Sequence, residues 1–265
     1  RDRIIAGNSF PPDSGFLFEY PFVNRGFYGP LYAVVEHPEL CQVMCNGMLL
    51  SQCTDKVWLD DEFGIYEIPE AVLQEQNVLS VKAVPFDVCM ELQPVYLLGN
   101  FSLRPAEKGF EIVEEQTLNI GGLCTQGVYF YPGRVIYAFV YIWDGSSDFV
   151  SVELGKYEVS ALTLQVNGCY AGMAGTGTGD RWEISPYLRK GENEIIIELS
   201  CSLKNLFGPH HTPEPVRNSA WPNAWKMAPV YCQPAGKKYD CIDYGLKENI
   251  LIKTGQNTLN SKQNR

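Results

Sequence analysis

The sequence predicts an all-β protein: two tandem antiparallel β-sandwich domains followed by a C-terminal tail that packs on them. Two observations carry this prediction. Short apolar segments rich in β-branched and aromatic residues are separated by turns, for which the 265-residue chain supplies 24 Gly and 17 Pro. In addition, a set of motifs occurs twice along the chain at a nearly constant offset. Short strands divided by turn residues are typical of β-sandwiches.

The expected strands are either alternating or continuously apolar, and few windows with helical periodicity extend beyond about ten residues. β-Branched and aromatic residues dominate these segments, which favours strands over helices. The clearest expected strands are residues 31–36, 95–98, 134–143, 149–154, 161–166 and 194–199.

Two of the repeated motifs are Asn-Gly pairs, each directly after an alternating apolar segment. They are Asn46-Gly47 and Asn167-Gly168, which lie 121 residues apart. A type I′ turn requires positive φ at both central residues, and Asn-Gly meets this requirement well. The pairs therefore predict tight hairpins at corresponding places in two copies of one unit.

Downstream of each Asn-Gly pair comes an aromatic–acid–Ile motif, then an asparagine before a long strand. Ile68 and Asn77 are nine residues apart, and so are Ile184 and Asn193. The offset between these copies is 116 residues, so an insertion of five residues in the first copy accounts for the difference from 121. An apolar residue four positions after each isoleucine completes the correspondence: Val72 and Leu188.

The repeat places the first sandwich domain at residues 14–103 and the second at residues 107–204. Residues 104–109, which include Pro and Gly, are the expected linker. Residues 205–255, with two Trp and six Pro, are the expected tail that packs on the sandwiches. The polar residues 256–265 are expected to be flexible.

The charge balance excludes some partners. Lys and Arg number 21 and Asp and Glu 31, which gives a net charge of −10. Proteins that bind nucleic acids normally present a basic face, so we expect no nucleic-acid partner. No apolar stretch approaches the roughly 20 residues of a membrane-spanning helix, so we expect a soluble chain without a membrane partner. The chain begins at Arg1 without a signal peptide, and we expect a piece of a longer polypeptide whose compartment the sequence does not specify.

The nine cysteines are expected to be reduced. Their number is odd, their spacing is irregular, no Cys-x-x-Cys pair occurs, and a chain of this length can build an ordinary core. One or two disulfides are the alternative. With only three histidines in the chain, a zinc site is not expected. The cysteines are Cys41, Cys45, Cys53, Cys89, Cys124, Cys169, Cys201, Cys232 and Cys241.

The repeated motif resembles the sugar-binding jelly-roll domains of family 2 glycoside hydrolases, which are also called galactose-binding-like domains. A more extensive resemblance is to the C-terminal region of large bacterial enzymes related to α-L-rhamnosidases and family 2 hydrolases. It covers about residues 15–255, and three segments carry it. These are residues 94–101 (PVYLLGNF), 126–137 (QGVYFYPGRVIY) and 202–211 (SLKNLFGPHH).

The resemblance implies a non-catalytic accessory or carbohydrate-binding region of a bacterial glycoside hydrolase-like protein. In such relatives a catalytic barrel lies N-terminal to this region, so the implied partners are carbohydrate and that upstream domain. A purely structural or protein-interaction module is the alternative, and a small standalone carbohydrate-active enzyme is the third reading. The chain departs from the family at Gln76, where Gly is usual, and in its glycine-rich loop at residues 172–180.

No catalytic residue and no cofactor are expected. Glycosidases need two carboxyl groups that flank one bond, whereas the adjacent acids Asp60-Asp61 and Glu114-Glu115 point to opposite faces of an extended chain. Residues 175–180 lack the lysine and the following helix of a nucleotide-binding loop. Asp60 is expected to support a local backbone turn, and a structural Ca²⁺ in such an acidic loop is the alternative.

Aromatic side chains near strand ends are the expected sugar contacts. Sugars stack their C–H faces on aromatic rings while neighbouring polar groups bind their hydroxyls. Core packing is the alternative for each Trp, most of all for Trp182, because Tyr66 occupies the equivalent position in the first copy. A structural or interdomain role is the alternative for the two histidines. The expected ligand-binding residues are Tyr131, Trp143, Asp144, Asp180, Arg181, Trp182, His210 and His211.

Overall fold

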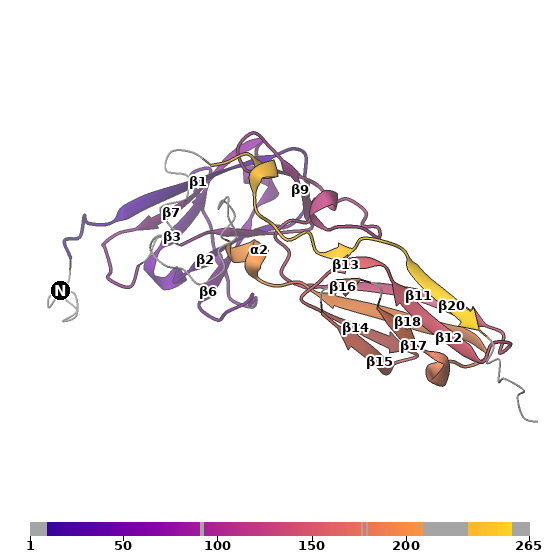
Figure 1. Ribbon diagram of the computed structural model, residues 1–265. Coiled ribbons are helices and arrows are strands. Elements are labelled where there is room, and N and C mark those ends of the chain that lie inside the picture. The colour runs from indigo at the N-terminus through magenta and orange to yellow at the C-terminus, as the bar shows by residue number, and fades with distance from the viewer. Residues whose placement is uncertain (1–9, 91–92, 176, 179, 209–232, 256–265) are drawn as a thin grey trace, which may run out of the picture. The chain divides into compact units, whose positions relative to one another are not determined.

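The fold of the chain is all-β, as predicted, and Figure 1 shows it as a computed structural model. Among the described residues the helical elements are the one-turn helix α2 (Lys204–Phe207) and short 3-10 turns. No described helix combines the length and the apolar character needed to cross a bilayer. The structure describes residues 10–90, 93–175, 177–178, 180–208 and 233–255.

The chain divides into two compact units. One comprises Arg1–Gln116 together with Ala235–Lys237, and the other comprises Thr117–Pro234 together with Lys238–Arg265. Each unit has a hydrophobic core of its own.

The first unit is a sandwich of a six-stranded and a four-stranded sheet. Its strands are β1 (Phe16–Asn24), β2 (Leu31–Glu36), β3 (Gln42–Cys45), β4 (Met48–Leu49), β5 (Gln52–Cys53), β6 (Phe63–Ile68), β7 (Gln76–Ala83), β8 (Tyr96–Leu98), β9 (Phe101–Pro105) and β10 (Phe110–Glu114). The larger sheet has the order β4-β3-β7-β1-β10-β9, in which only the β1–β10 pair is parallel. The smaller sheet has the order β5-β6-β2-β8.

Side chains from both sheets of the first unit meet in one core. Alternate residues of β2 point inward, among them Leu31, Ala33 and Val35. Across from them, β7 contributes Leu79 and Val81. Because side chains alternate between the faces of a strand, this spacing of two is what a half-buried sheet requires.

The second unit has the same kind of sandwich. Its strands are β11 (Arg134–Trp143), β12 (Phe149–Leu154), β13 (Lys156–Glu158), β14 (Ala161–Val166), β15 (Cys169–Ala174), β16 (Gly177–Thr178), β17 (Arg181–Glu183), β18 (Gly191–Ser200), β19 (Gly245–Leu246) and β20 (Ile250–Gly255). One sheet has the order β11-β18-β14-β15. It faces two three-stranded sheets of order β17-β12-β20 and β16-β13-β19 across a common core.

The strand orders of the two units correspond, which confirms the internal repeat. The order β1-β7-β3-β4 in the first unit recurs as β11-β18-β14-β15 in the second. In the opposite sheets, β6 lies beside β2 just as β17 lies beside β12. Both predicted Asn-Gly turns adopt positive φ, with values of 48° and 82° at residues 46–47 and of 51° and 77° at residues 167–168.

An asparagine pair ties the loops together in the first unit. The Nδ2 of Asn46 donates to the Oδ1 of Asn77 (2.9 Å) and to the carbonyl of Val72 (2.8 Å). Asn77 in turn bonds Gln74 on both sides, accepting from its amide (2.8 Å) and donating to its carbonyl (2.7 Å). The amide of Val78 donates to Asn46 Oδ1 (2.9 Å), so this pair joins the hairpin turn, the loop and β7.

The second unit contains the same pair. The Nδ2 of Asn167 donates to Asn193 Oδ1 (2.8 Å) and to the carbonyl of Tyr187 (2.9 Å). Asn193 accepts from the amide of Arg189 (2.8 Å) and donates to its carbonyl (2.8 Å). Both Asn77 and Asn193 are buried, and a buried amide needs all these partners to offset its lost hydration.

The hydrogen bonds correct the expected pairing of Val72 with Leu188. The amides of Leu73 and Leu188 close the 3-10 turns Glu70–Val72 and Ser185–Tyr187, each by donating to the first residue of its turn. Leu188 therefore corresponds to Leu73. The second copy has one more residue between this turn and its asparagine than the first copy has, and Gly191, just before Asn193, adopts a φ of 101°.

The expected linker at residues 104–109 is also corrected. Arg104 and Pro105 belong to β9, which pairs with β10 in an antiparallel hairpin, and the amide of Ala106 donates to the carbonyl of Gly109 (2.9 Å). The compact unit continues to Gln116. In the tail, β20 pairs with β12 and β19 with β13, while Ala235–Lys237 belongs to the first unit.

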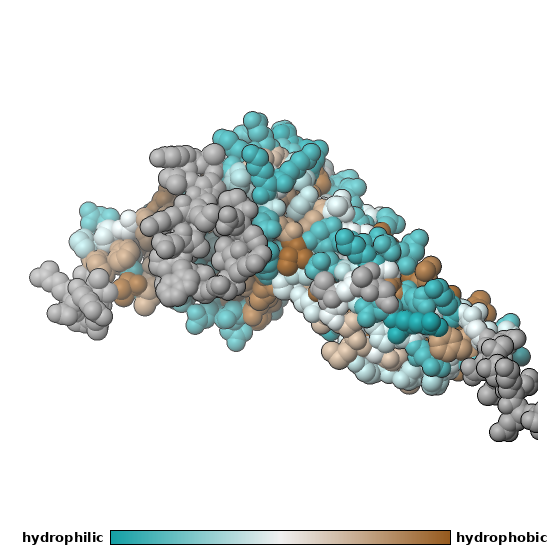
Figure 2. Space-filling model, viewed as in Figure 1, coloured by the Kyte–Doolittle hydropathy of each residue, from teal (hydrophilic) through white to brown (hydrophobic). Residues whose placement is uncertain are grey.

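Hydrophilic and hydrophobic residues are interspersed over the coloured part of the face shown in Figure 2. Ion pairs bridge neighbouring strands, as where Lys253 and Arg181 both contact Glu153 at 2.5 Å and 3.2 Å.

Replacing Asn193 by Ala tests the asparagine pair. The substitution removes one of the two acceptors of the Asn167 Nδ2 and leaves the amide and carbonyl of Arg189 without their side-chain partner, so we expect the free energy of unfolding of the second unit to fall by about 2–4 kcal/mol. Scanning calorimetry measures this loss. The matched control is Glu194→Ala, an exposed side chain on the same strand, which we expect to change stability by less than about 0.5 kcal/mol. Equal stability of the two variants would show that the pair is dispensable.

Candidate functional site

An open cleft lies at one end of the first sandwich, between the loop that joins β1 to β2 and the residues that join β6 to β7. Its volume of about 400 Å³ is in the usual range for small-molecule sites. Both of its walls are loops at strand ends, which is where binding residues concentrate in β-sandwiches. The lining residues are Asn24, Arg25, Gly26, Phe27, Tyr28, Glu70, Leu73, Gln74 and Glu75.

Asn24 fixes one wall of the cleft. Its side chain is buried, donates to the carbonyl of Phe27 (3.1 Å) and accepts from the amide of Phe27 (2.9 Å), which closes residues 24–27 into a turn. The φ of 92° at Gly26 within this turn is one that glycine adopts without strain. The main-chain amide of Asn24 also donates to the carbonyl of Glu75 (2.8 Å), which ties the two walls together.

Two neighbours hold Tyr28 outward. Phe27 is buried in the core, where its ring meets Phe101 edge-on with a centroid separation of 5.7 Å. A Cβ on Gly29 would lie 3.0 Å from the Phe27 ring, so the chain folds closely around that anchor. Tyr28, between these residues, is 76% exposed. An anchored backbone therefore presents an aromatic ring to solvent at the mouth of the cleft.

Arg25 connects the β1–β2 loop to the residues between β6 and β7 through its side chain. Its guanidinium forms an ion pair with Glu75, and its Nε lies 3.2 Å from the Oε1 of Glu111. Arg104 binds the other oxygen of Glu111 at 2.6 Å. The hydrogen bond from Arg104 is the main cause that lowers the pKa of Glu111, with a further contribution from Arg25. Glu111 therefore stays ionised and keeps Arg25 in place.

The cleft combines one exposed aromatic face with several hydrogen-bonding groups. Glu70, Gln74 and Glu75 are exposed along one wall, opposite Tyr28 and Arg25. Carboxylates accept and amides and guanidinium groups donate hydrogen bonds, so the wall offers both kinds of partner. Such a set suits a ligand with many hydroxyl groups and one apolar face.

The structure places the expected residues Trp143 and Asp144 at the end of β11. The ring of Trp143 is partly buried against the core of the second unit, and its Nε1 is buried without a hydrogen-bond partner among the described residues. Asp144 is exposed and accepts from the amide (2.8 Å) and the hydroxyl (2.6 Å) of Ser146, which lowers the pKa of its carboxyl group. The side chain of Asp144 therefore stabilises the turn at residues 144–146.

The expected group Asp180, Arg181 and Trp182 is divided between two faces. The hydroxyl of Tyr157 donates to Asp180, while Trp182 packs against the core and against Gly172, where a Cβ would lie 2.2 Å from the indole. Arg181 points the other way, contacts Glu153 and covers the ring of Phe149 at 4.6 Å. Successive side chains of a strand alternate in direction, so Arg181 and Trp182 cannot bind one face of a ligand.

The pair Trp143 and Asp144 and the group at residues 180–182 also lie toward opposite ends of β12. Asp144 precedes the loop that leads into the first residue of this strand, Phe149, whereas the carbonyl of Asp180 accepts from the amide of its last residue, Leu154 (2.9 Å). Six residues of extended chain span about 20 Å. The structure therefore brings Asp180 and Trp182 to one region of the second unit and Trp143 and Asp144 to another.

Of the remaining expected residues, Tyr131 is exposed and its hydroxyl donates to the carbonyl of Arg134 (3.2 Å) at the start of β11. That position is the strand end opposite to Trp143. His210 and His211 lie outside the described residues, as do Trp221 and Trp225.

The cleft lies at the loop of the first unit that corresponds to the loop of the second unit where Trp143 and Asp144 were expected to contact a ligand. β1 and β11 correspond, so the turn after Asn24 in the first unit matches the turn after Trp143 in the second. In the second unit this loop carries Gly and Ser residues, whereas in the first it carries Arg25 and Tyr28. The sequence feature that could have indicated this cleft is the Gly-Phe-Tyr-Gly segment at residues 26–29, in which two aromatic residues lie between two glycines.

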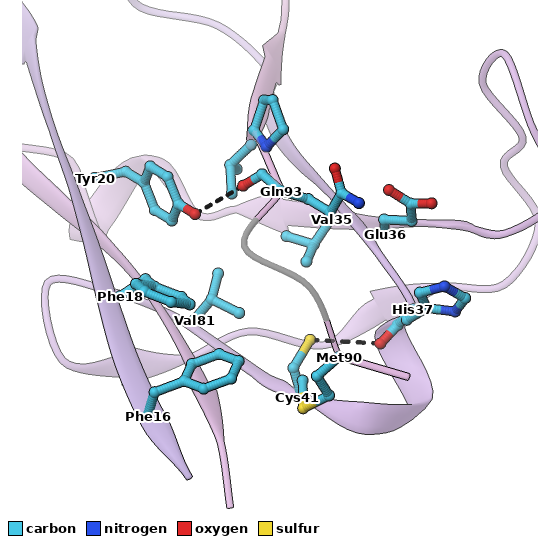
Figure 3. Close-up of a pocket in the computed structure, with 12 residues that line it drawn as sticks. Phe16, Phe18, Tyr20, Val35, Glu36, His37, Cys41, Val81, Met90 and Gln93 are labelled. Carbon is cyan, nitrogen blue, oxygen red and sulfur yellow. Dashed lines mark hydrogen bonds between the residues drawn. The ribbon is translucent and has the colours of Figure 1, made fainter. Parts of the chain in front are cut away.

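A second, narrow crevice in the first unit is lined mainly by apolar residues (Figure 3). The rings of Phe16 and Phe18 face it from β1, and the hydroxyl of Tyr20 donates to the carbonyl of Gln93 (2.8 Å). The thiol of Cys41 points to the carbonyl of His37 (3.7 Å) rather than to the imidazole. Burial, with a contribution from Glu39, raises the pKa of Cys41 to about 11, so the thiol stays protonated at neutral pH.

The two acidic pairs lie in a turn and at a strand end. Asp60 Oδ1 accepts from the amide of Glu62 (3.0 Å), which confirms its expected role in a local turn. Glu114 ends β10, next to Glu115, and both are exposed.

No protein-family model and no curated protein match the chain. Similar solved structures include a rhamnosidase from Novosphingobium sp. PP1Y, with 17% identity over 91% of this chain and 22% of that chain, and a TM-score of 0.35. A β-D-glucuronidase from Dictyoglomus thermophilum shares 17% identity over 60% of this chain and 27% of its own, with a TM-score of 0.34. An FMN-binding β-glucuronidase from Facaelibacterium prausnitzii L2-6 shares 22% identity over 57% and 20%, with a TM-score of 0.28.

These structural neighbours are glycoside hydrolases, and the chain spans 20–27% of their length. TM-scores below 0.5 do not establish a shared fold, so the cleft is interpreted from its own geometry.

Alkylation with iodoacetamide at pH 7.5 tests the state of the cysteines. The buried thiols have pKa values raised by burial, to about 11 for Cys45 and Cys201 and to about 12 for Cys124, so few thiolates form. We expect Cys89 and Cys169, which are exposed, to be labelled first. Peptide mass spectrometry reads the order. Rapid labelling of Cys124 in the folded chain would contradict the expected order of labelling.

Proposed function

We propose that this chain is a non-catalytic accessory region of a glycoside hydrolase-like protein and that it binds carbohydrate in the cleft beside Tyr28. The observation that supports this proposal is the exposed Tyr28 ring, held by Phe27 and Gly29 at the mouth of a cleft lined by Arg25, Glu70 and Gln74. The fold is a tandem pair of sandwiches in which this cleft occupies the loop end of the first copy.

The chemistry of the cleft fits a sugar ring. One face of a pyranose presents C–H groups that pack on an aromatic ring, and its rim presents hydroxyls that both donate and accept. Tyr28 supplies the ring, the Glu70 carboxylate accepts, and Arg25 and Gln74 donate. Arg25 is already oriented by Glu75 and Glu111, so little side-chain entropy is lost when a ligand binds.

The same contacts support a binding role rather than hydrolysis. The Glu75 carboxylate forms an ion pair with the Arg25 guanidinium. This ion pair orients Arg25, so Glu75 has a structural role in the cleft. The acidic pairs at residues 60–61 and 114–115 lie in a turn and at a strand end, away from the residues that line the cleft. Hydrolysis requires two carboxyl groups on either side of one glycosidic bond.

The wider proposal rests on the sequence resemblance. The chain resembles galactose-binding-like jelly-roll domains and the C-terminal region of rhamnosidase-related enzymes, in which a catalytic barrel precedes this region. We therefore place the chain beside such a domain in one polypeptide, where the cleft would hold a glycan near the catalytic centre. No cofactor takes part in this role.

Replacing Tyr28 by Ala tests the proposed cleft on a glycan array. Loss of the stacking face is expected to weaken binding about tenfold or more, whereas Tyr28→Phe keeps the ring and keeps most of the affinity. Tyr170, which is 57% exposed in the second unit, supplies the matched control Tyr170→Ala, for which no change is expected. An array without hits, or binding that Tyr28→Ala leaves intact, would favour a purely structural or protein-interaction module.

Incubation with nitrophenyl glycosides separates binding from catalysis. We expect no release of nitrophenol, because Glu75, one of the two carboxylates that line the cleft, is paired with Arg25, whereas hydrolysis needs two carboxyl groups that act on one bond. Absorbance at the wavelength of the phenolate measures release. Turnover that Glu70→Gln or Glu75→Gln abolishes would instead identify a small carbohydrate-active enzyme.

A further inference from the structure

A group of metal-ligating side chains lies at the rim of the apolar crevice, away from the cleft at Tyr28. Glu36 ends β2, His37 follows it directly, and Glu62 directly precedes β6. One ligand atom from each of the three lies within 4.8 Å of the others. In Figure 3 the side chains of Glu36 and His37 lie together on one side, away from the phenylalanine rings that face the crevice.

We propose that Glu36, His37 and Glu62 bind one divalent transition-metal ion, with Zn²⁺ as the preferred ion. The proposal does not depend on carbohydrate binding, since the cleft at Tyr28 and this group share no residue.

The main chain fixes the three ligands relative to one another. β2 and β6 are antiparallel neighbours with Glu36 opposite Phe63, and the amide of His37 donates to the carbonyl of Glu62 (3.3 Å). Glu36 is the last residue of β2, and His37 and Glu62 lie just beyond the paired ends of β2 and β6. His37 has a φ of 51°, so it does not follow the extended alternation that would point its side chain away from Glu36.

The surroundings of the imidazole favour ligation through Nε2. The Nδ1 of His37 lies 3.3 Å from the Oε1 of Glu39, and its Nε2 lies 3.9 Å from the Oε2 of Glu62. In metal sites, the ring nitrogen that does not bind the metal commonly donates to a carboxylate, which fixes the tautomer. Glu39 is placed to take that role, which leaves the Nε2 lone pair directed toward Glu62.

The donor set selects the class of metal. One imidazole and two carboxylates match zinc and its transition-metal neighbours, whereas Ca²⁺ takes six to eight oxygen ligands. Tetrahedral zinc with bonds of about 2.0–2.2 Å places ligand atoms about 3.4 Å apart. The 3.9 Å separation of His37 and Glu62 would have to close by about 0.5 Å, and no separation in the group exceeds 4.8 Å, so rotations of the half-buried His37 and the exposed Glu62 side chains would bring the ligand atoms together. Solvent would complete the coordination.

The sequence did not predict this site because Glu36, His37 and Glu62 form no zinc motif along the chain. Glu62 is 25 residues from His37, and only the β2–β6 pairing brings them together. A metal here would join the turn at residues 37–41 to the loop at residues 54–62.

Isothermal titration of the full chain with ZnCl₂ alone tests the proposal. We expect one site that His37→Gln removes, that Glu62→Gln weakens at least tenfold, and that Glu39→Gln weakens by about tenfold because the imidazole loses its orienting partner. Circular dichroism shows whether each variant is folded. Glu67→Gln, which removes an exposed carboxylate of β6 outside this group, is the matched control, and it should leave this site unchanged.

Two results would overturn the proposal. One is zinc binding of unchanged affinity and stoichiometry in folded His37→Gln. The other is a titration with CaCl₂ that shows tighter binding than zinc and no dependence on His37, which would indicate a carboxylate-only site. Neither readout involves a glycan. A chain that binds no zinc could therefore still bind a glycan beside Tyr28, and a chain that binds no glycan could still bind zinc.

Discussion

Both units depend on the hydrogen-bonded asparagine pair that recurs at residues 46 and 77 and at residues 167 and 193. An asparagine amide donates twice and accepts through two lone pairs, so two facing asparagines can join each other and still bind the main chain. In each unit the pair connects a hairpin turn, the loop before the long strand and the start of that strand. No apolar pair of the same volume could satisfy these buried main-chain groups.

This constraint leads directly to the cleft. Asn77 bonds the amide and the carbonyl of Gln74, and Asn46 bonds the carbonyl of Val72, so the wall formed by residues 70–75 is fixed from behind. The opposite wall is fixed by Asn24 in the same way. With both walls held, the exposed side chains of Tyr28 and Gln74 keep a defined separation, and a ligand would bind without paying to order the loops.

Much of the fold was predictable because its signals are local. Alternating apolar residues predicted strands such as Leu31–Glu36 and Ala161–Val166, and Asn-Gly predicted two turns with positive φ. The linker expected at residues 104–109 was wrong because Pro and Gly punctuate hairpins as readily as domain boundaries. The pairing of Val72 with Leu188 was one residue off because spacing alone does not show which residue closes a turn.

The cleft was less predictable because its parts are distant in sequence. Arg25 meets Glu75, 50 residues away, and Glu111, 86 residues away, and no periodicity encodes such contacts. The position of an aromatic residue at a strand end did not indicate whether its ring is exposed. Trp143 and Trp182 pack against a core, whereas Tyr28 is exposed because the adjacent Phe27 is buried in its place.

The most direct test of the account is to map a bound glycan on the folded chain by NMR, following backbone amide shifts during titration with an oligosaccharide that binds on the array. We expect the largest changes at residues 24–28 and 70–75, the two walls of the cleft that the asparagines hold. Changes centred on residues 143–148 or 180–182 of the second unit, with none around Tyr28, would contradict it.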